Sequence, residues 1–319
     1  MLGRAFAHVP AGHPGSVCPS PRPTPAFAGA PRAGKCARYS GRVLSLLALA
    51  SSMVWGSSDF VAGVKSKDRP APAVVGWSQA IGLLVISVVV LLSSPHFADG
   101  PWPVWAMAAG LGGAWGLVCF YTALSTGTMG VVAPIASLGV VVPLTLGVLA
   151  GETPGWLTWC GIVLAILGVL LASGPEFGGG VVARRPVLLA CAAGVGFGIA
   201  LYSLDRGGEY SVVNTLWGMR LTSVTCFALA ALVLRRTGGV TRADLPALTF
   251  VGVADLAANG MFAYASAHGY VSVASVLGSL YPVVTAVLAY AVLKERLRPI
   301  QLGGAVATVA GVALIAAGG

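Results

Sequence analysis

The 319-residue chain is too poor in charge for an ordinary soluble protein: 56% of its residues are hydrophobic and only 9% are charged, whereas soluble domains carry about a quarter charged residues. A net charge of +9 could indicate nucleic-acid binding. Outside the first 42 residues, however, the basic residues lie mostly in short loops between apolar runs, as juxtamembrane charges do. Composition therefore excludes a nucleic-acid partner and favours a protein embedded in the lipid bilayer.

Residues 1–42 form a segment rich in Pro, Gly, Ala and Arg, with six of the 19 basic residues and no acidic one. The segment has no apolar run of signal-peptide length and no helical periodicity. We predict a disordered tail that is either dispensable or an artefact of an upstream start codon. A targeting segment and a regulatory arm are the alternatives.

Ten apolar stretches of about 20 residues follow the tail, each long enough for a membrane helix. The link between the third and fourth and the link between the eighth and ninth are so short that these pairs must form tight helical hairpins. The predicted helices cover residues 44–64, 73–93, 102–124, 129–150, 156–173, 186–204, 212–234, 245–267, 272–293 and 299–317. The predicted fold is an all-α membrane protein with ten transmembrane helices.

Three prolines lie inside these predicted helices: Pro134 and Pro143 in the fourth, and Pro282 in the ninth. A proline in a membrane helix frees backbone carbonyl groups, which is tolerated beside other protein segments or a cavity. Each proline is therefore either a simple packing kink or a gating hinge.

The two halves of the chain align with an offset of about 142 residues. Trp55-Gly56 falls on Phe197-Gly198, and the run that begins at Phe120 falls on the run that begins at Phe262. Each half holds five helices, and because five is odd the second half enters the membrane from the opposite side. We therefore predict two inverted repeats, residues 43–173 and 187–319, joined by a linker at 174–186. Inverted repeats place a binding site near the midplane and permit alternating access.

Short motifs recur in a fixed order along both halves. In chain order they are Trp55-Gly-Ser-Ser-Asp-Phe60, Phe120-Tyr-Thr-Ala-Leu124, Pro134, Gly151-Glu152, Leu280-Tyr-Pro-Val-Val-Thr-Ala286 and Leu293-Lys-Glu-Arg-Leu297. On these motifs the chain resembles the EamA-type drug/metabolite transporter superfamily over about residues 43–318. The first half departs from the pattern, since it reads Leu138-Gly-Val-Val-Val-Pro143 where the second half has Leu280-Tyr-Pro282, so the two kinks can differ.

The resemblance implies a ten-helix bundle with a central cavity in the inner or plasma membrane. It also implies export or exchange of small metabolites, amino acids or drugs, often coupled to protons, and it leaves the substrate open. It marks Glu152 and Glu295, at the ends of the fourth and ninth helices, as recurrent gate or cap residues.

Four polar residues lie deep in predicted membrane helices, namely Asp59, Arg220, Asp255 and Asn259. Arg220 and Asp255 are about 15 and 11 residues from the loop that joins their helices, a depth difference of roughly 6 Å that an Arg side chain can span. These two residues can therefore form an ion pair that neutralises buried charge. Alternatively, Asp255 or Asp59 carries a coupling proton and Arg220 binds an anionic substrate group.

The repeat favours the functional alternative for these four residues. Their equivalents in the other half are Leu201, Ser78, Gly113 and Leu117, none of which is charged. A scaffold feature should occur in both halves, whereas a one-sided charge fits a substrate-facing role. Further candidates for the substrate or ion pathway, each of which can instead be a packing group, are Gln79, Tyr121, Tyr264 and Tyr281.

Small residues spaced four apart, at Gly112 and Gly116 and at Gly194 and Gly198, predict close helix packing. The sequence has no HExxH motif, GxGD motif, clustered His or Cys residues, nucleophile elbow or Walker A motif. An intramembrane enzyme is therefore a disfavoured alternative. A non-transporting scaffold is disfavoured as well, because of the inverted repeats and the one-sided buried charges. No metal and no cofactor is predicted. The predicted partners are a small-molecule substrate, the bilayer and protons, and a homodimer is left open.

Basic loop residues predict the orientation ambiguously. They lie almost entirely on one side of the membrane, which carries Lys65, Lys67, Arg69, Arg184, Arg185, Arg235, Arg236, Arg242, Lys294, Arg296 and Arg298. The positive-inside rule places this side in the cytoplasm and both termini outside. The basic tail and the family resemblance favour cytoplasmic termini instead, so both orientations stay open.

Overall fold

The chain folds as a bundle of α-helices, as its composition predicts. The computed structural model describes residues 41–93, 99–140, 142, 155–172, 184–235, 238–268, 277–278, 280–294 and 298–318. Within them the α-helices are α1 (Gly41–Asp68), α2 (Ala71–Ser93), α3 (Trp102–Thr126), α4 (Met129–Ala136), α6 (Trp156–Ala172), α7 (Arg184–Gly208), α8 (Val212–Leu234), α9 (Leu245–His268), α11 (Tyr281–Leu293) and α12 (Pro299–Gly318). Two short 3-10 helices, η1 (Ser137–Val140) and η2 (Arg242–Asp244), complete this set. The predicted tail lies almost wholly outside the described residues.

Six of these helices are long and apolar enough to cross a membrane. They are α1, α2, α3, α7, α8 and the span Arg242–His268 that includes α9. The apolar parts described for α4 with η1, α6, α11 and α12 are shorter. All-α architecture is therefore confirmed, and every predicted segment contains a helix, although six rather than ten of the described helices reach full membrane length.

The fourth predicted segment is not one continuous helix. The α-helical hydrogen-bond pattern ends at Ala136, two residues after Pro134, and the chain continues as the 3-10 helix η1. Proline has no backbone N–H and its ring crowds the carbonyl one turn earlier, so an α-helix readily ends beside it. The Ser137 hydroxyl donates to the Pro134 carbonyl oxygen (2.7 Å) and satisfies part of the broken turn. Pro143 lies outside the described residues.

The ninth segment also departs from the prediction. Pro282 was expected inside a helix spanning 272–293, but α11 begins at Tyr281 and Pro282 stands in its first turn. A proline is favoured there because the first N–H groups of a helix have no partner within the helix. Pro282 therefore lies at the start of α11 and not inside it, and whether it acts as a packing kink or as a gating hinge stays a prediction.

Helices of the two halves pack against each other in a repeated pattern. The most extensive contacts join α3 with α7, α6 with α12 and α1 with α9, and α8 packs on α2 and α3. Each of these contacts has a counterpart when every helix is replaced by the corresponding helix of the other half. The corresponding pairs are α1 and α7, α2 and α8, α3 and α9, α4 and α11, and α6 and α12. Two duplicated repeats are expected to give such matching contacts.

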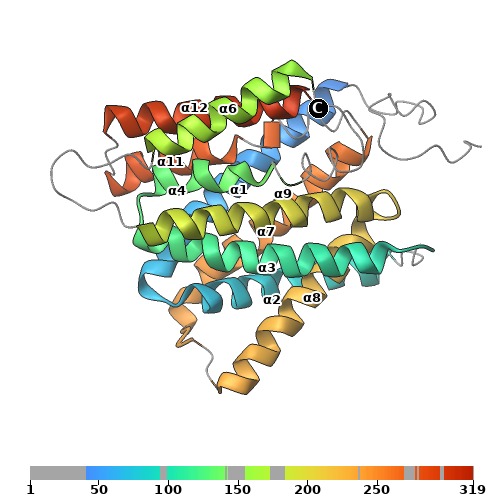
Figure 1. Cartoon of the computed structure of the whole chain (residues 1–319). Helices are drawn as coiled ribbons and strands as arrows, with labels where there is room; N and C mark the ends of the chain where they lie inside the picture. The colour runs from blue at the N-terminus through green and yellow to red at the C-terminus, as the bar shows by residue number, and fades with distance from the viewer. Residues whose placement is uncertain are drawn as a thin grey trace, which may run out of the picture.

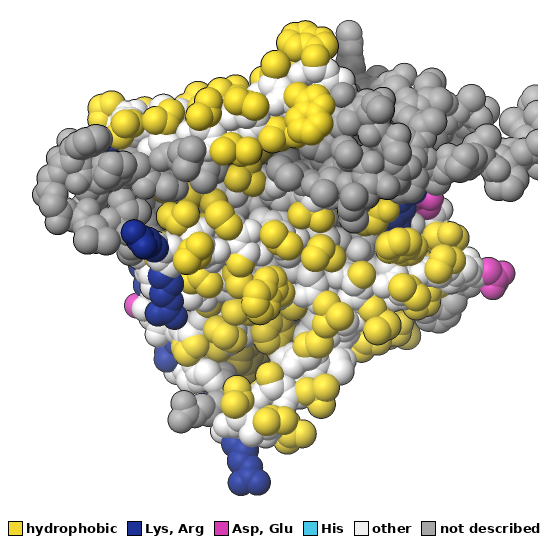
Figure 2. Space-filling model, in the orientation of Figure 1, with side chains coloured by type: hydrophobic (Ala, Val, Ile, Leu, Met, Phe, Trp, Pro, Cys, Tyr) yellow, Lys and Arg dark blue, Asp and Glu magenta, His cyan; other side chains and the backbone are white. Residues whose placement is uncertain are grey.

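The bundle presents an apolar girdle and a basic end. The helices run roughly side by side, with α6 and α12 together at the top and α8 crossing obliquely below (Figure 1). Hydrophobic side chains cover the middle of the visible face in Figure 2, and most visible Lys and Arg side chains lie at its left edge and lower tip. We call the helix ends near residues 65–72, 184–186, 235, 238–244, 294 and 298–299 the basic end, and the other side the opposite end.

Glycines permit the closest helix contacts near the middle of the bundle. A Cβ atom added at Gly196 of α7 would lie 2.7 Å from the Gly112 carbonyl oxygen and 2.8 Å from the Gly116 Cα atom of α3. Gly194 and Gly198 likewise approach the backbone of Gly139 in η1. The predicted small-residue faces are therefore confirmed.

Candidate substrate cavity

A cavity of about 200 Å³ lies between helices of the two halves. Its walls come from α1, α2, α3 and η1 of the first half and from α7, α8, α9 and the start of α11 of the second. Most of the lining is apolar, with a few polar side chains that converge from different helices. This combination is typical of a small-molecule site.

Arg220 and Asp255 form the ion pair that their depth in the bundle predicts. The Arg220 Nη2 atom of α8 lies 2.8 Å from the Asp255 Oδ2 atom of α9, and both side chains are buried. A buried pair of this kind is costly to break, because each partner left alone is an uncompensated charge in a medium of low dielectric constant.

Gln79 and Asn259 complete a four-residue network around this pair. Arg220 Nη1 donates to Gln79 Oε1, and Gln79 Nε2 in turn donates to Asp255 Oδ2 (3.2 Å). Asn259, one turn after Asp255, donates through Nδ2 to Asp255 Oδ1 (3.1 Å). Because Gln79 lies on α2, the network joins the two halves of the chain.

Asp59 lies at the cavity wall with a different kind of partner. Its Oδ1 atom accepts a hydrogen bond from the Tyr121 hydroxyl (3.3 Å), and both residues are buried. Among the described residues no Lys or Arg forms an ion pair with Asp59. Within the described part of the chain, Asp59 is therefore a buried carboxyl group whose side-chain partner is a neutral donor.

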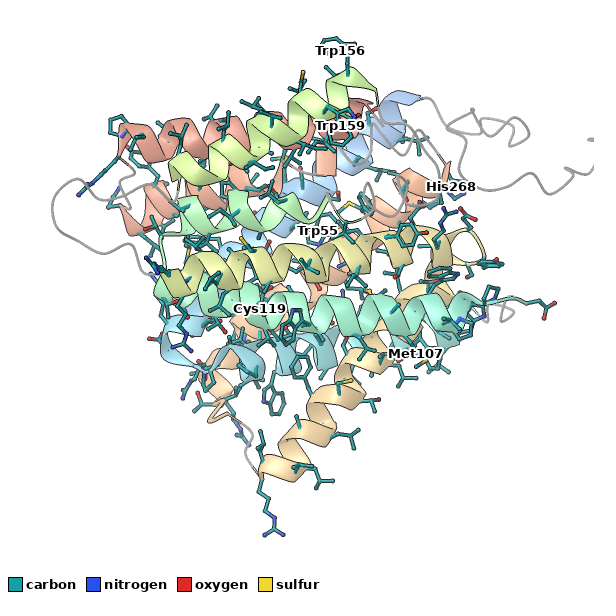
Figure 3. The ribbon with its side chains drawn as sticks, viewed as in Figure 1. Trp55, Met107, Cys119, Trp156, Trp159 and His268 are labelled. Carbon is teal, nitrogen blue, oxygen red and sulfur yellow. The ribbon has the colours of Figure 1, made fainter. Side chains whose placement is uncertain are left out.

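Aromatic rings form much of the remaining wall. Trp55, one turn before Asp59 on α1, packs against Phe262 of α9 with ring centroids 5.7 Å apart. Trp55 lies inside the bundle in Figure 3, whereas Trp156 and Trp159 lie at the outer end of α6. The Tyr281 ring stands edge-on to Phe120, and its buried hydroxyl has no hydrogen-bond partner in the described part of the chain.

The structure does not bring every predicted site residue to the cavity. Asp59, Gln79, Arg220, Asp255, Asn259 and Tyr281 line it, and Tyr121 reaches it through Asp59. Tyr264 is not among the lining residues and instead stacks on His268 near the end of α9 (ring centroids 4.2 Å apart). Glu152 and Glu295, the predicted gate or cap residues, lie outside the described residues.

Sequence reasoning missed several lining residues, among them Trp55, Phe197, Phe262 and Asp205. Three of these were visible as matched positions of the repeat, but the repeat does not say which matched positions face a cavity. Asp205 was assigned to a loop after a helix ending at 204, whereas α7 continues to Gly208. A charged residue near a helix end is ambiguous between loop and last turn.

Comparison with known proteins agrees with the repeated architecture. The family model for the EamA-like transporter family matches twice, over residues 43–174 and 184–317. A solved crystal structure with 18% sequence identity superposes with a TM-score of 0.61, over 86% of this chain and 96% of the other, which supports a shared fold. Curated protein sequences give no significant match. The chain therefore belongs to the EamA-like transporter family and is a multi-pass membrane protein of a family whose members are typically transporters rather than enzymes.

Proposed function

We propose that the chain is a secondary transporter that exports or exchanges small organic solutes such as metabolites, amino acids or drugs, coupled to protons. It works in the inner or plasma membrane by alternating access between two inverted repeats, residues 43–173 and 187–319. The observation that carries the proposal is the buried, charged cavity to which both halves contribute. Buried ionisable groups in a membrane bundle are typical of substrate and proton pathways.

The packing pattern supports the inverted arrangement. If a twofold axis relates the halves, each contact between two helices should recur between their counterparts. The α3–α7 contact recurs as α9–α1, and the α3–α8 contact recurs as α9–α2. Five passes in each half place the axis of that relation in the membrane plane, which is the arrangement found in inverted-repeat transporters.

The position of the cavity along the helices indicates which end is closed. Asp59 lies nine residues before the basic end of α1, a depth of roughly 14 Å. Asp205 lies only three residues before the opposite end of α7, a depth of roughly 5 Å. A packed apolar layer separates the cavity from the basic end, and it includes Val74, Val75, Leu124, Leu248 and Val251.

A polar cluster at the basic end holds this side shut. Asp244, at the start of the α9 span, accepts from Lys65 Nζ (3.2 Å) and from Arg69 Nε (3.0 Å), so it ties the α1–α2 connection to the second half. Thr241 forms a capping box with Asp244 and fixes the position of its carboxylate. We propose that these contacts form a gate that opens in the other half of the transport cycle.

Asp244→Asn is expected to open the basic end more often. The two ion pairs are partly exposed, and losing about 1 kcal/mol of attraction would raise the population of the open state about fivefold. Thiol labelling of a cysteine at Ser58, whose hydroxyl donates to the Val251 carbonyl across the α1–α9 contact, measures this in a cysteine-free background. Asp68→Asn, at an exposed residue of the same end, should leave labelling unchanged. Equal rates in Asp244→Asn would contradict the gate.

Reconstituted protein is expected to move at least one small organic solute faster than protein-free liposomes do. The measurement is uptake of a panel of cationic, zwitterionic, neutral and anionic solutes, with and without an imposed pH gradient. A gradient-dependent rate supports proton coupling. A transport rate that does not depend on the pH gradient would contradict proton coupling but not transport itself. Transport of no solute in any charge class would overturn the proposed function.

A further inference from the structure

Acidic groups outnumber basic groups on the cavity wall. Asp59, Asp205 and Asp255 contribute three carboxyl groups to the described lining, whereas Arg220 contributes the one guanidinium. With every group in its usual charge state the wall carries an excess of negative charge. In a medium of low dielectric constant such an excess attracts a cation and repels an anion.

Arg220 is not available to bind an anionic substrate. The residue is 2% exposed, and its guanidinium lies 2.8 Å from Asp255 through one terminal nitrogen and donates to Gln79 through the other. A substrate carboxylate would have to displace Asp255, which would leave that carboxylate buried without its cation. The structure therefore disfavours the sequence-based expectation that Arg220 binds an anionic substrate group.

Of the two lining carboxyl groups that Arg220 does not pair with, Asp59 lies deeper along its helix than Asp205 does. It lines the cavity, and within the described part of the chain its side chain accepts a hydrogen bond from the neutral Tyr121 hydroxyl and forms no ion pair. Trp55 precedes it by one helical turn on the same face of α1. A cation bound to Asp59 would thus lie beside an indole ring, which attracts cations through its negative face.

The rest of the wall suits an aromatic or apolar body. Phe262 packs against Trp55, and Phe197 also lines the cavity. Tyr281 also lines the cavity, and its buried hydroxyl has no hydrogen-bond partner among the described residues. Buried polar groups normally have a hydrogen-bond partner, so this hydroxyl is an additional group that a bound molecule can satisfy.

From these observations we propose that the substrates are organic monocations, in which a protonated or quaternary amine binds Asp59 and an apolar or aromatic body contacts Trp55, Phe262 and Phe197. The inference rests on the proposed transport function and names its substrate class. A zwitterionic amino acid fits less well, because its carboxylate would find Arg220 already paired.

Three probes that share a phenyl ring and differ in charge test the inference. They are 2-phenylethylamine, phenylalanine and 3-phenylpropionate, and titration calorimetry on the detergent-solubilised full chain measures their binding. The amine is expected to bind at least about tenfold more tightly than the other two, as one favourable charge interaction of about 1.4 kcal/mol requires. Tighter binding of 3-phenylpropionate or phenylalanine would overturn the inference.

Asp59→Asn is the matched variant, because asparagine keeps the size of the side chain and an oxygen that can accept from Tyr121. The variant should lose the preference for the amine, and its binding of 3-phenylpropionate should be as strong as in the native chain or stronger, because a negative charge that repels the anion is gone. Asp68→Asn removes an exposed carboxylate from the same helix and should keep the preference. Unchanged amine binding in Asp59→Asn would overturn the role of Asp59.

The solute panel separates this inference from the proposed function. Transport of anions or zwitterions without cations would overturn the substrate class and leave the transporter assignment standing. Transport of no solute of any charge would overturn both. Transport of cations that fails in Asp59→Asn, while the purified variant keeps the elution volume of the native chain, would support both.

Discussion

Asp255→Asn is expected to abolish most transport and to destabilise the folded protein by about 3–5 kcal/mol, the range found when one partner of a buried ion pair is removed. The variant leaves Arg220 as a buried cation that keeps its hydrogen bond to the Gln79 amide oxygen but has lost its anionic partner. Arg220→Ala should have a comparable effect, because it leaves Asp255 without its cation. Thermal unfolding in detergent and uptake by proteoliposomes measure the two effects, and membrane insertion should persist.

The double variant Arg220→Met, Asp255→Leu separates the structural role of the pair from its functional role. Apolar replacement of a complete buried pair is often neutral or stabilising, so thermal stability should return towards that of the native chain. Transport should not return if the pair takes part in the cycle. Recovery of both stability and transport would show that the pair serves only to neutralise buried charge. Native-like transport in both single variants would contradict the assignment of Arg220 and Asp255 to the functional site.

Gly196→Ala is expected to give the second large effect, a loss of about 1–3 kcal/mol of stability through overpacking. The added methyl group would lie under 3.0 Å from backbone atoms of Gly112 and Gly116. Backbone atoms cannot rotate away as a side chain can, so α3 and α7 would have to separate along their most extensive contact.

Gly113→Ala is the matched control for this contact. Gly113 neighbours Gly112 on α3, but a Cβ atom there would meet only the Ala200 Cβ atom, at an ordinary 3.8 Å. Alanine favours a helix over glycine by about 1 kcal/mol, so this variant should be as stable as the native chain or slightly more so. Equal melting temperatures for the two variants would contradict the role of the glycine contact.

Features that depend on spacing along one helix, or on the depth of two helices that share a loop, could be predicted from the sequence. The Arg220–Asp255 pair follows from counting residues back from the loop between α8 and α9, and the position of Asn259 follows from helical periodicity. Gln79 was singled out only as a lone polar residue, because its partnership depends on how α2 packs against the other half.

Features that depend on where a helix begins, or on which of its faces is buried, could not be predicted. A proline such as Pro282 is compatible both with a kink inside a helix and with the first turn of a helix. In the structure it lies in the first turn of α11, which packs on α1 and α4. Tyr264 lies five residues after Asn259 and so on a different face of α9. Hydrophobicity does not distinguish these faces, since α9 is apolar on nearly every side.

The one-sided charges have a consequence for the direction of transport. In two identical inverted repeats, the states open to either side of the membrane would be related by symmetry and would have equal free energy. Asp59, Arg220 and Asp255 have the uncharged counterparts Leu201, Ser78 and Gly113, so this degeneracy is lifted. The resting protein would therefore favour one facing, and a chain inserted the other way round would favour the opposite side of the membrane.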